Sequence, residues 1–235
     1  MSLDFDGVDD VVICNGQTVG TLISAVIYFD ADTQGQSNNG ALFGHGNYET
    51  SVGRGYLAWN ATAASKKLRF VACKSASSGR WDMTTGFTTL TGPKAALVTY
   101  DSGSNVNDPI LYLLEGSTLS VLTVGAGLTE VQTPSGSDGT DNVPWRVGNA
   151  NGNTRTFDGR LGEHALWQRI FSLAEAGNVL FGGPMKAPGM YLYWPMDDSG
   201  VAHATDYSGN ARHGILTNGP VRAVNPAVRP AMRQG

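Results

Sequence analysis

The chain has 235 residues, of which 31 are glycine and only 15% are Asp, Glu, Lys or Arg. This length suits a single β-sandwich or β-barrel domain, and so few charges disfavour a helical protein, which would carry more Lys, Glu and Ala. The formal net charge of −4 disfavours nucleic acid as a partner, because nucleic-acid-binding domains are basic.

Apolar, β-branched and aromatic runs separated by Gly, Asn, Asp and Ser predict short strands through the first half of the chain. We expect these strands within residues 3–13, 21–29, 40–46, 55–59, 67–73 and 95–100. The longest apolar run, 22–29, is too short to span a bilayer, so we expect no membrane-spanning segment.

In the second half, residues 110–124 predict a hairpin, and the polar residues 133–142 are typical of a surface loop. Further strands are expected at 145–148, 157–167 and 190–195. In 157–167, alternation places Leu161, Ala165 and Trp167 on one face, with His164 as a surface residue. Trp145, Trp167 and Trp194 are expected in the core.

One helix is predicted to begin at Ser172. Ser172 and Glu175 have the spacing of a capping box, and the apolar residues that follow recur at helical spacing. The sequence Gly-Gly-Pro at 182–184 ends the helix.

Both cysteines, Cys14 and Cys73, lie in apolar, strand-like stretches. The first residues show no basic segment followed by an apolar one, so we expect no signal peptide. Synthesis in a reducing compartment then favours two buried thiols over a disulfide, with the disulfide as the alternative.

Three segments carry a resemblance to a known family. They are LDFDGVDD at 3–10, then FDGRLGEHALW at 157–167 with the predicted helix after it, and YWPMDD at 193–198 followed by DYSGNARHG at 206–214. Together they resemble the laminin-G-like jelly rolls of the concanavalin A-like lectin and glucanase group. In that family the Trp-containing segment usually precedes the opening strand, whereas here it comes last, so we expect the two segments to be spatial neighbours.

The resemblance implies an all-β fold, a two-sheet antiparallel jelly-roll sandwich with one short helix. We expect this domain to cover residues 1–219. Residues 220–235 are rich in proline, which cannot donate to a β-ladder, and they predict an extended basic arm. Arg222, Arg229 and Arg233 would contact a partner through this arm; the alternative is a disordered tail.

The resemblance also implies a calcium site, because members of the family often bind calcium. Hard oxygen ligands from irregular loops suit this ion, and the candidate ligands are Asp4, Asp6, Asp9, Asp10, Asp206 and Asn210. The alternative is that these side chains cap backbone amides in turns.

Sugar binding is a second property that the resemblance implies. Aromatic residues in polar, glycine-rich surroundings are the candidate glycan contacts: Tyr48, Tyr56, Trp59 and Trp81. The alternative is that each covers an edge of the core. None of the five Glu residues begins the E-x-D-x-x-E strand of the glucanases, so we expect no enzyme.

These features predict a non-catalytic structural or adhesion protein. The first hypothesis is a surface component of a phage or phage-like virion, either a capsid decoration or head-spike protein or a tail protein. It would be made in the host cytoplasm, reside in the virion, form a homo-oligomer and contact other virion proteins. The alternative is a carbohydrate-binding module for surface glycans, with or without calcium.

Overall fold

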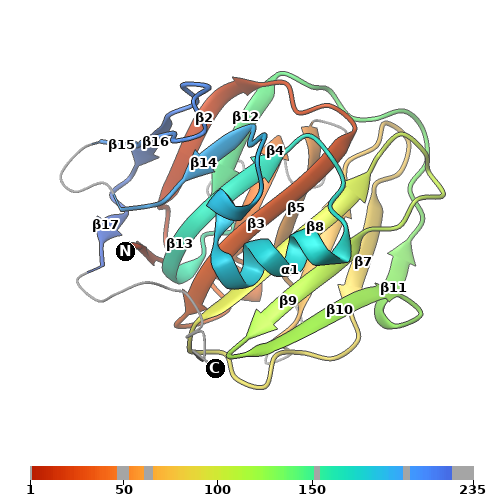
Figure 1. Cartoon of the computed structure of the whole chain (residues 1–235), viewed down its shortest axis with the longest axis horizontal. Coiled ribbons are helices and arrows are strands. Elements are labelled where there is room, and N and C mark those ends of the chain that lie inside the picture. The colour runs from red at the N-terminus through yellow and green to blue at the C-terminus, as the bar shows by residue number, and fades with distance from the viewer. Residues whose placement is uncertain (1, 47–52, 61–65, 151–153, 198–201, 224–235) are drawn as a thin grey trace.

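The computed structural model describes residues 2–46, 53–60, 66–150, 154–197 and 202–223, which form two largely antiparallel β-sheets packed face to face (Figure 1). We call them sheet A and sheet B. In order of pairing, sheet A contains β17 (Val221–Arg222), β1 (Leu3–Asp6), β13 (Asp158–Trp167), β3 (Leu22–Ala31), β8 (Lys94–Asp101), β9 (Ile110–Glu115) and β10 (Thr118–Val124). The predicted all-β sandwich with one α-helix is confirmed.

Sheet B lies behind sheet A in the view of Figure 1. Its strands, again in order of pairing, are β15 (His203–Ala204), β16 (Gly214–Thr217), β2 (Val11–Gln17), β12 (Val143–Val147), β4 (Ala41–Gly46), β5 (Gly53–Trp59), β6 (Leu68–Ala72), β7 (Gly79–Met83) and β11 (Gly127–Gln132). A two-residue parallel pairing of β10 with β11 joins the two sheets at one side.

The helix α1 (Leu173–Gly182) lies across the outer face of sheet A (Figure 1). Its N-terminus has the predicted capping box, in which the Ser172 hydroxyl accepts from the Glu175 amide and the Glu175 carboxylate accepts from the Ser172 amide. The apolar side of the helix buries Ala176, Val179 and Leu180 against sheet A. Two short 3-10 turns complete the helical structure, at Gln36–Asn38 and Pro184–Lys186.

The core between the sheets is aromatic and aliphatic. Trp145 and Trp194 are buried between the two sheets, and Trp167 is buried beneath α1, which confirms their predicted place in the core. Both cysteines are buried free thiols, and burial raises the pKa of Cys14 to about 11 and that of Cys73 to about 12. Across the described residues, no helix is long and apolar enough to cross a membrane.

A β-bulge in β13 changes which residues face the core. The register with β3 shifts between Leu161 and His164, so a strict two-residue alternation fails there. Leu161 and Leu166 face sheet B, while Ala165 and Trp167 face α1. The prediction that Leu161, Ala165 and Trp167 share a face was therefore wrong, and so was the surface position of His164, which is fully buried.

His164 links the two sheets through its imidazole ring. The Trp145 indole on β12 donates to His164 Nε2 at 2.7 Å, and His164 Nδ1 lies 2.8 Å from the Val26 carbonyl on β3. An acceptor at Nε2 and a carbonyl partner at Nδ1 fix the neutral tautomer with the proton on Nδ1. Burial lowers the pKa of His164 to about 3, although the Val26 carbonyl acts in the opposite direction.

The first and last segments of the sandwich are neighbours, as the sequence predicted. β1 and β14 (Leu192–Trp194) pair with successive parts of the same edge of β13. β16 pairs with β2, and the Asn218 side chain donates to the Asp9 carbonyl. Val221 and Arg222, predicted as the start of the arm, form β17 beside β1.

Candidate functional site

A row of outward-facing side chains crosses sheet B. The register places Tyr56 on β5 opposite Val71 on β6, Val71 opposite Arg80 on β7, and Arg80 opposite Gln132 on β11. Residues directly opposite one another on a sheet lie close enough to interact. Four strands thus contribute one aromatic, one aliphatic, one cationic and one amide side chain to a continuous line on the outer face.

This row lies in a hollow of about 360 Å³, which we call the sheet B hollow. The segment 74–78, between β6 and β7, lines the hollow together with Arg69 and the row itself. Ser75, Ser77 and Ser78 of this segment bring hydroxyl groups to its surface. The row and this segment together form a concave, mainly polar site of the size that small ligands occupy.

Glycine makes room for the aromatic end of the row. Gly44 on β4 stands opposite Tyr56, and a Cβ added at Gly44 would come within 2.8 Å of the Tyr56 Cβ. Tyr56 is only 6% exposed, so its ring is held in place rather than free in solution. The hollow therefore has a rigid aromatic end.

A second row runs beside the first, through Ala58, Arg69 and Asp82. The Arg69 guanidinium binds the Asp82 carboxylate with two hydrogen bonds, of 2.6 and 2.8 Å, and also donates to the Asn60 side chain. Such fork-to-fork pairs are geometrically rigid. Arg69 is thus a fixed and neutralised cation at the border of the hollow.

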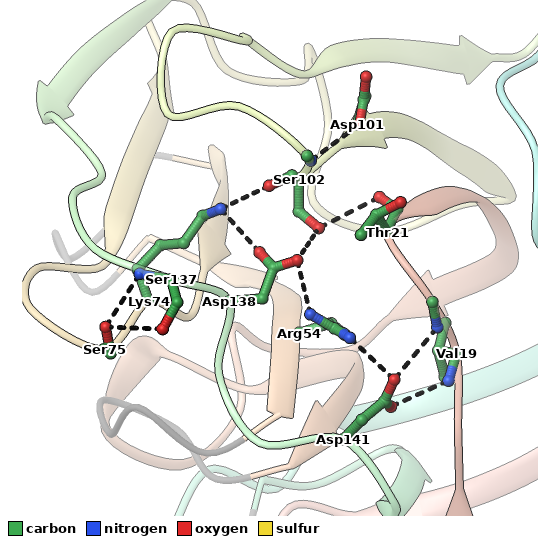
Figure 2. A network of polar contacts seen from close by, with 12 residues as sticks. Val19, Thr21, Arg54, Lys74, Ser75, Asp101, Ser102, Ser137, Asp138 and Asp141 are labelled. Atoms are coloured by element: carbon green, nitrogen blue, oxygen red, sulfur yellow. Dashed lines mark hydrogen bonds and ion pairs between the residues drawn. The ribbon is translucent and has the colours of Figure 1, made fainter.

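The segment that lines the hollow is held by a buried charge network (Figure 2). The Lys74 ammonium lies 2.7 Å from the Asp138 carboxylate and donates to the Ser102 carbonyl. Arg54 binds the other Asp138 oxygen at 2.6 Å and also binds Asp141 at 2.8 Å. The network fastens the predicted surface loop 133–142 against β5 and the end of β6.

Asp141 extends this network to the chain before β3. It accepts from the Val19 and Gly20 amides, as Figure 2 shows for Val19. Burial raises the pKa of Asp141, but the hydrogen bonds from Arg54 and the Val19 amide outweigh it and hold the pKa below its ordinary value. The carboxylate is therefore ionised at neutral pH and serves as a structural anchor.

Of the predicted glycan contacts, the structure brings one to the hollow. Tyr56 lines it, whereas Trp59 and Trp81 point inward and are 0% exposed. Their burial removes both tryptophans from the candidate sugar contacts, because strand alternation turns them to the core. Tyr48 lies outside the described residues.

Three of the predicted calcium ligands lie together. Carboxylate oxygens of Asp6, Asp9 and Asp10 come within 4.8 Å of one another in the turn after β1, the one such acidic, histidine or cysteine group found among the described residues. Two of them also cap the turn, since Asp10 accepts from the Asp6 amide and Asp6 accepts from the Val8 amide. The turn-capping alternative is thus directly present, and calcium stays a prediction.

The other three predicted ligands are not part of this group of carboxylates, although Asp4 is near enough to help raise the pKa of Asp10. Asp206 organises its own turn by accepting from the Tyr193, Ser208 and Arg212 amides. Asn210 donates to the Met190 carbonyl, and Asp4 lies on β1 near Arg160. Asp206 and Asn210 therefore organise the turn after β14, and Asp4 belongs to sheet A; calcium binding by these three residues stays a prediction.

The Asp10 carboxyl gives a pH-dependent prediction. Burial raises the pKa of Asp10 to about 6, and the negative charges of Asp6, Asp9 and Asp4 act in the same direction. The hydrogen bond from the Asp6 amide acts in the opposite direction. A raised pKa means that stability is lost as pH rises through the range from about 4 to 6, so an uncharged Asn at this position avoids the loss. We expect Asp10→Asn to raise the free energy of unfolding at pH 7 by about 1 kcal/mol, after allowance for solvent screening.

Urea unfolding in chelator-treated buffer at pH 7 and pH 4 measures this effect, which should vanish at pH 4. A Ca²⁺ titration of the same two proteins tests calcium binding. A bound ion would stabilise the wild type, which would then be more stable than Asp10→Asn. An Asp10→Asn protein less stable than the wild type in chelator would contradict the prediction.

The residues of the predicted arm are only partly placed. Arg222 lies at the edge of sheet A, exposed, in β17. Arg229 and Arg233 lie outside the described residues. Partner contact through these three arginines stays a prediction.

Sequence reasoning missed Arg69 and Arg80, although the signal was present. In LRFVA at 68–72 and GRWDM at 79–83, polar residues alternate with large apolar ones. Alternation that turns Trp81 to the core turns Arg80 and Asp82 to the outer face. In β7 the predicted site residue was Trp81, whereas the residue that faces outward is its neighbour Arg80.

No model of a known protein family matches the sequence, and a search of curated proteins finds no match. The fold is similar to a protein from Bacteroides ovatus that has been proposed to bind carbohydrate, with a TM-score of 0.60, 16% identity and 95% of this chain covered. This chain spans 61% of the length of that protein.

A second similar structure is the native heptameric SAP-like pentraxin of Limulus polyphemus. The TM-score is 0.50 at 11% identity, and the match covers 92% of this chain and 93% of the pentraxin chain. At these identities the likeness concerns the fold alone. The chain therefore shares the jelly-roll sandwich fold of these two proteins.

Proposed function

We propose that this protein binds carbohydrate in the sheet B hollow. The observation that carries the proposal is the hollow itself, where an immobilised tyrosine, serine hydroxyls, a glutamine amide and guanidinium groups line one concavity. Sugars present hydroxyls in fixed directions beside apolar C–H faces, so polar groups around an aromatic ring suit them.

The fold adds support to this choice. One similar structure is of a protein proposed to bind carbohydrate, and this favours the carbohydrate-binding alternative over the virion hypothesis. None of the described residues that line the hollow is a carboxylate, and these residues do not supply the pair of acids that glycoside hydrolysis requires. Binding without cleavage is the activity that suits these residues.

A steric variant tests the proposal. Ala76 is exposed and lines the hollow with a methyl group only, so Ala76→Leu fills space without removing a polar contact. We expect at least about a tenfold loss of affinity, a difference of about 1.4 kcal/mol, for any sugar that the wild type selects from a glycan array. Isothermal titration calorimetry measures it.

The matched control is Ala126→Leu, at an exposed alanine in the turn between β10 and β11. This variant should bind as the wild type does. Wild-type protein that ignores every glycan on the array, or equal affinities in Ala76→Leu and the wild type, would refute the proposal.

Homo-oligomer formation and a place in a virion stay predictions. The similar pentraxin is heptameric, which supports a test of assembly by native mass spectrometry. A virion component would associate with other particle proteins, and it could bind host glycans through the same hollow.

A further inference from the structure

The charges around the sheet B hollow are unequally matched. In the part of the chain that the structure describes, three cationic side chains line it, those of Arg69, Lys74 and Arg80, and no acidic side chain does. Arg69 is paired with Asp82 and Lys74 with Asp138. Among the described residues, Arg80 has no acidic partner, so this part of the chain leaves one positive charge in the hollow uncompensated.

The Arg80 guanidinium also has unused hydrogen-bonding capacity. Its Nε atom is buried and has no hydrogen-bond partner within the described structure. Buried N–H groups without partners are rare, because each costs about 1–3 kcal/mol of lost hydration. A ligand that accepts from Nε would relieve this cost, so the arginine is prepared for an acceptor rather than for an apolar group.

The strand pairing places Arg80 between Val71 and Gln132 in the hollow. Val71 and Gln132 stand directly opposite it on β6 and β11, and the Gln132 side-chain amide donates to the Ser77 hydroxyl. The Gln132 side-chain amide is therefore occupied by Ser77 of the lining segment. A guanidinium presents parallel N–H groups that match the two oxygens of a carboxylate or sulfate.

We propose that the sheet B hollow selects acidic sugars, with Arg80 binding the carboxylate or sulfate of the sugar. The inference rests on the proposed function and names its substrate class. Serine hydroxyls and Tyr56 would contact the sugar ring, while Arg80 supplies the preference for a negative charge. The interaction is an ion pair in a partly screened site, so added salt weakens it.

A matched pair of ligands tests the inference. Oligogalacturonate and its methyl ester share one sugar backbone and differ in charge. We expect the wild type to bind the free acid at least about tenfold more tightly than the ester, equivalent to about 1.4 kcal/mol, and Arg80→Gln to bind the two equally. Arg80→Lys keeps the positive charge but lacks the two parallel N–H groups of the guanidinium, so it should retain part of the preference for the acid.

The control protein is Lys186→Gln, which removes an exposed cation after α1 on the sheet A side. It changes the net charge as Arg80→Gln does and should keep the full preference. A sulfated oligosaccharide, compared with its desulfated form, distinguishes the two anionic groups. Circular dichroism and urea unfolding confirm that each variant is folded.

The outcomes separate this inference from the proposed function. Equal binding of acid and ester by the wild type, with both lost in Ala76→Leu, overturns the acidic preference and keeps carbohydrate binding. A preference that persists in Arg80→Gln overturns the role of Arg80. Absence of binding to the acidic, neutral and sulfated sugars alike overturns both proposals.

Discussion

Replacing Asp138 with alanine is expected to lower the free energy of unfolding by about 3–5 kcal/mol, the usual cost of removing one partner from a buried ion pair. Its carboxylate is the shared partner of two cations, Lys74 and Arg54. The Lys74 side chain is only 2% exposed, so water cannot replace the lost carboxylate. Urea unfolding followed by tryptophan fluorescence measures the change.

Two further proteins make this test specific. Asp101→Ala removes a half-buried carboxylate near the same network, which caps the Gly103 amide (Figure 2), and should cost about 1 kcal/mol or less. Lys74→Met combined with Asp138→Ala removes the stranded ammonium and should recover part of the stability. An Asp138→Ala protein within 1 kcal/mol of the wild type would show that the network is not a stabilising anchor.

Acidification should destabilise the protein through His164. Its pKa is about 3 in the folded state and about 6.5 in an unfolded chain, so the unfolded chain binds the proton first. The stability contributed by neutral His164 is complete above pH 6.5 and is lost as pH falls toward 3. Between pH 7 and pH 4, protonation of this single residue in the unfolded chain should lower the free energy of unfolding by roughly 3 kcal/mol.

The comparison protein is His164→Gln, whose amide cannot take up a proton in this range. It should be less stable than the wild type at pH 7, because the Trp145 indole and the Val26 carbonyl lose well-aligned partners. The advantage of the wild type over His164→Gln in free energy of unfolding should be smaller by roughly 3 kcal/mol at pH 4 than at pH 7. Parallel curves of stability against pH would contradict the assignment, since carboxylates titrate in both proteins alike.

The fold was predictable because its signals are local or repeat along the chain. Strand alternation, turn residues and the capping box of Ser172 each act over a few residues, and the structure confirms them. The neighbouring position of the first and last segments followed from the resemblance, and it too is confirmed. These features depend on backbone propensities and on the distribution of apolar residues.

Two features could not be predicted from the sequence, one in the core and one in the candidate site. A bulge in β13 adds a residue that no pattern in the sequence marks, so the face of His164 came out reversed. The hollow depends on pairing between β7 and β11, which are about fifty residues apart in sequence. Tyr56 could be predicted from its residue type, but the place of Arg80 in the site depends on the strands that pair with β7 on either side.

The pairing of β1 has a consequence for how the molecule is built. β1 hydrogen-bonds on one side to β13 and on the other to β17, elements that follow it by some 150 to 220 residues. During synthesis at roughly 5–20 residues per second, about 8 to 30 seconds pass before β13 can pair with one edge of this strand, and about 10 to 45 seconds before β17 can pair with the other. High contact order of this kind slows folding, and the acidic residues on and after β1 give the waiting segment a charge that opposes premature pairing with other chains.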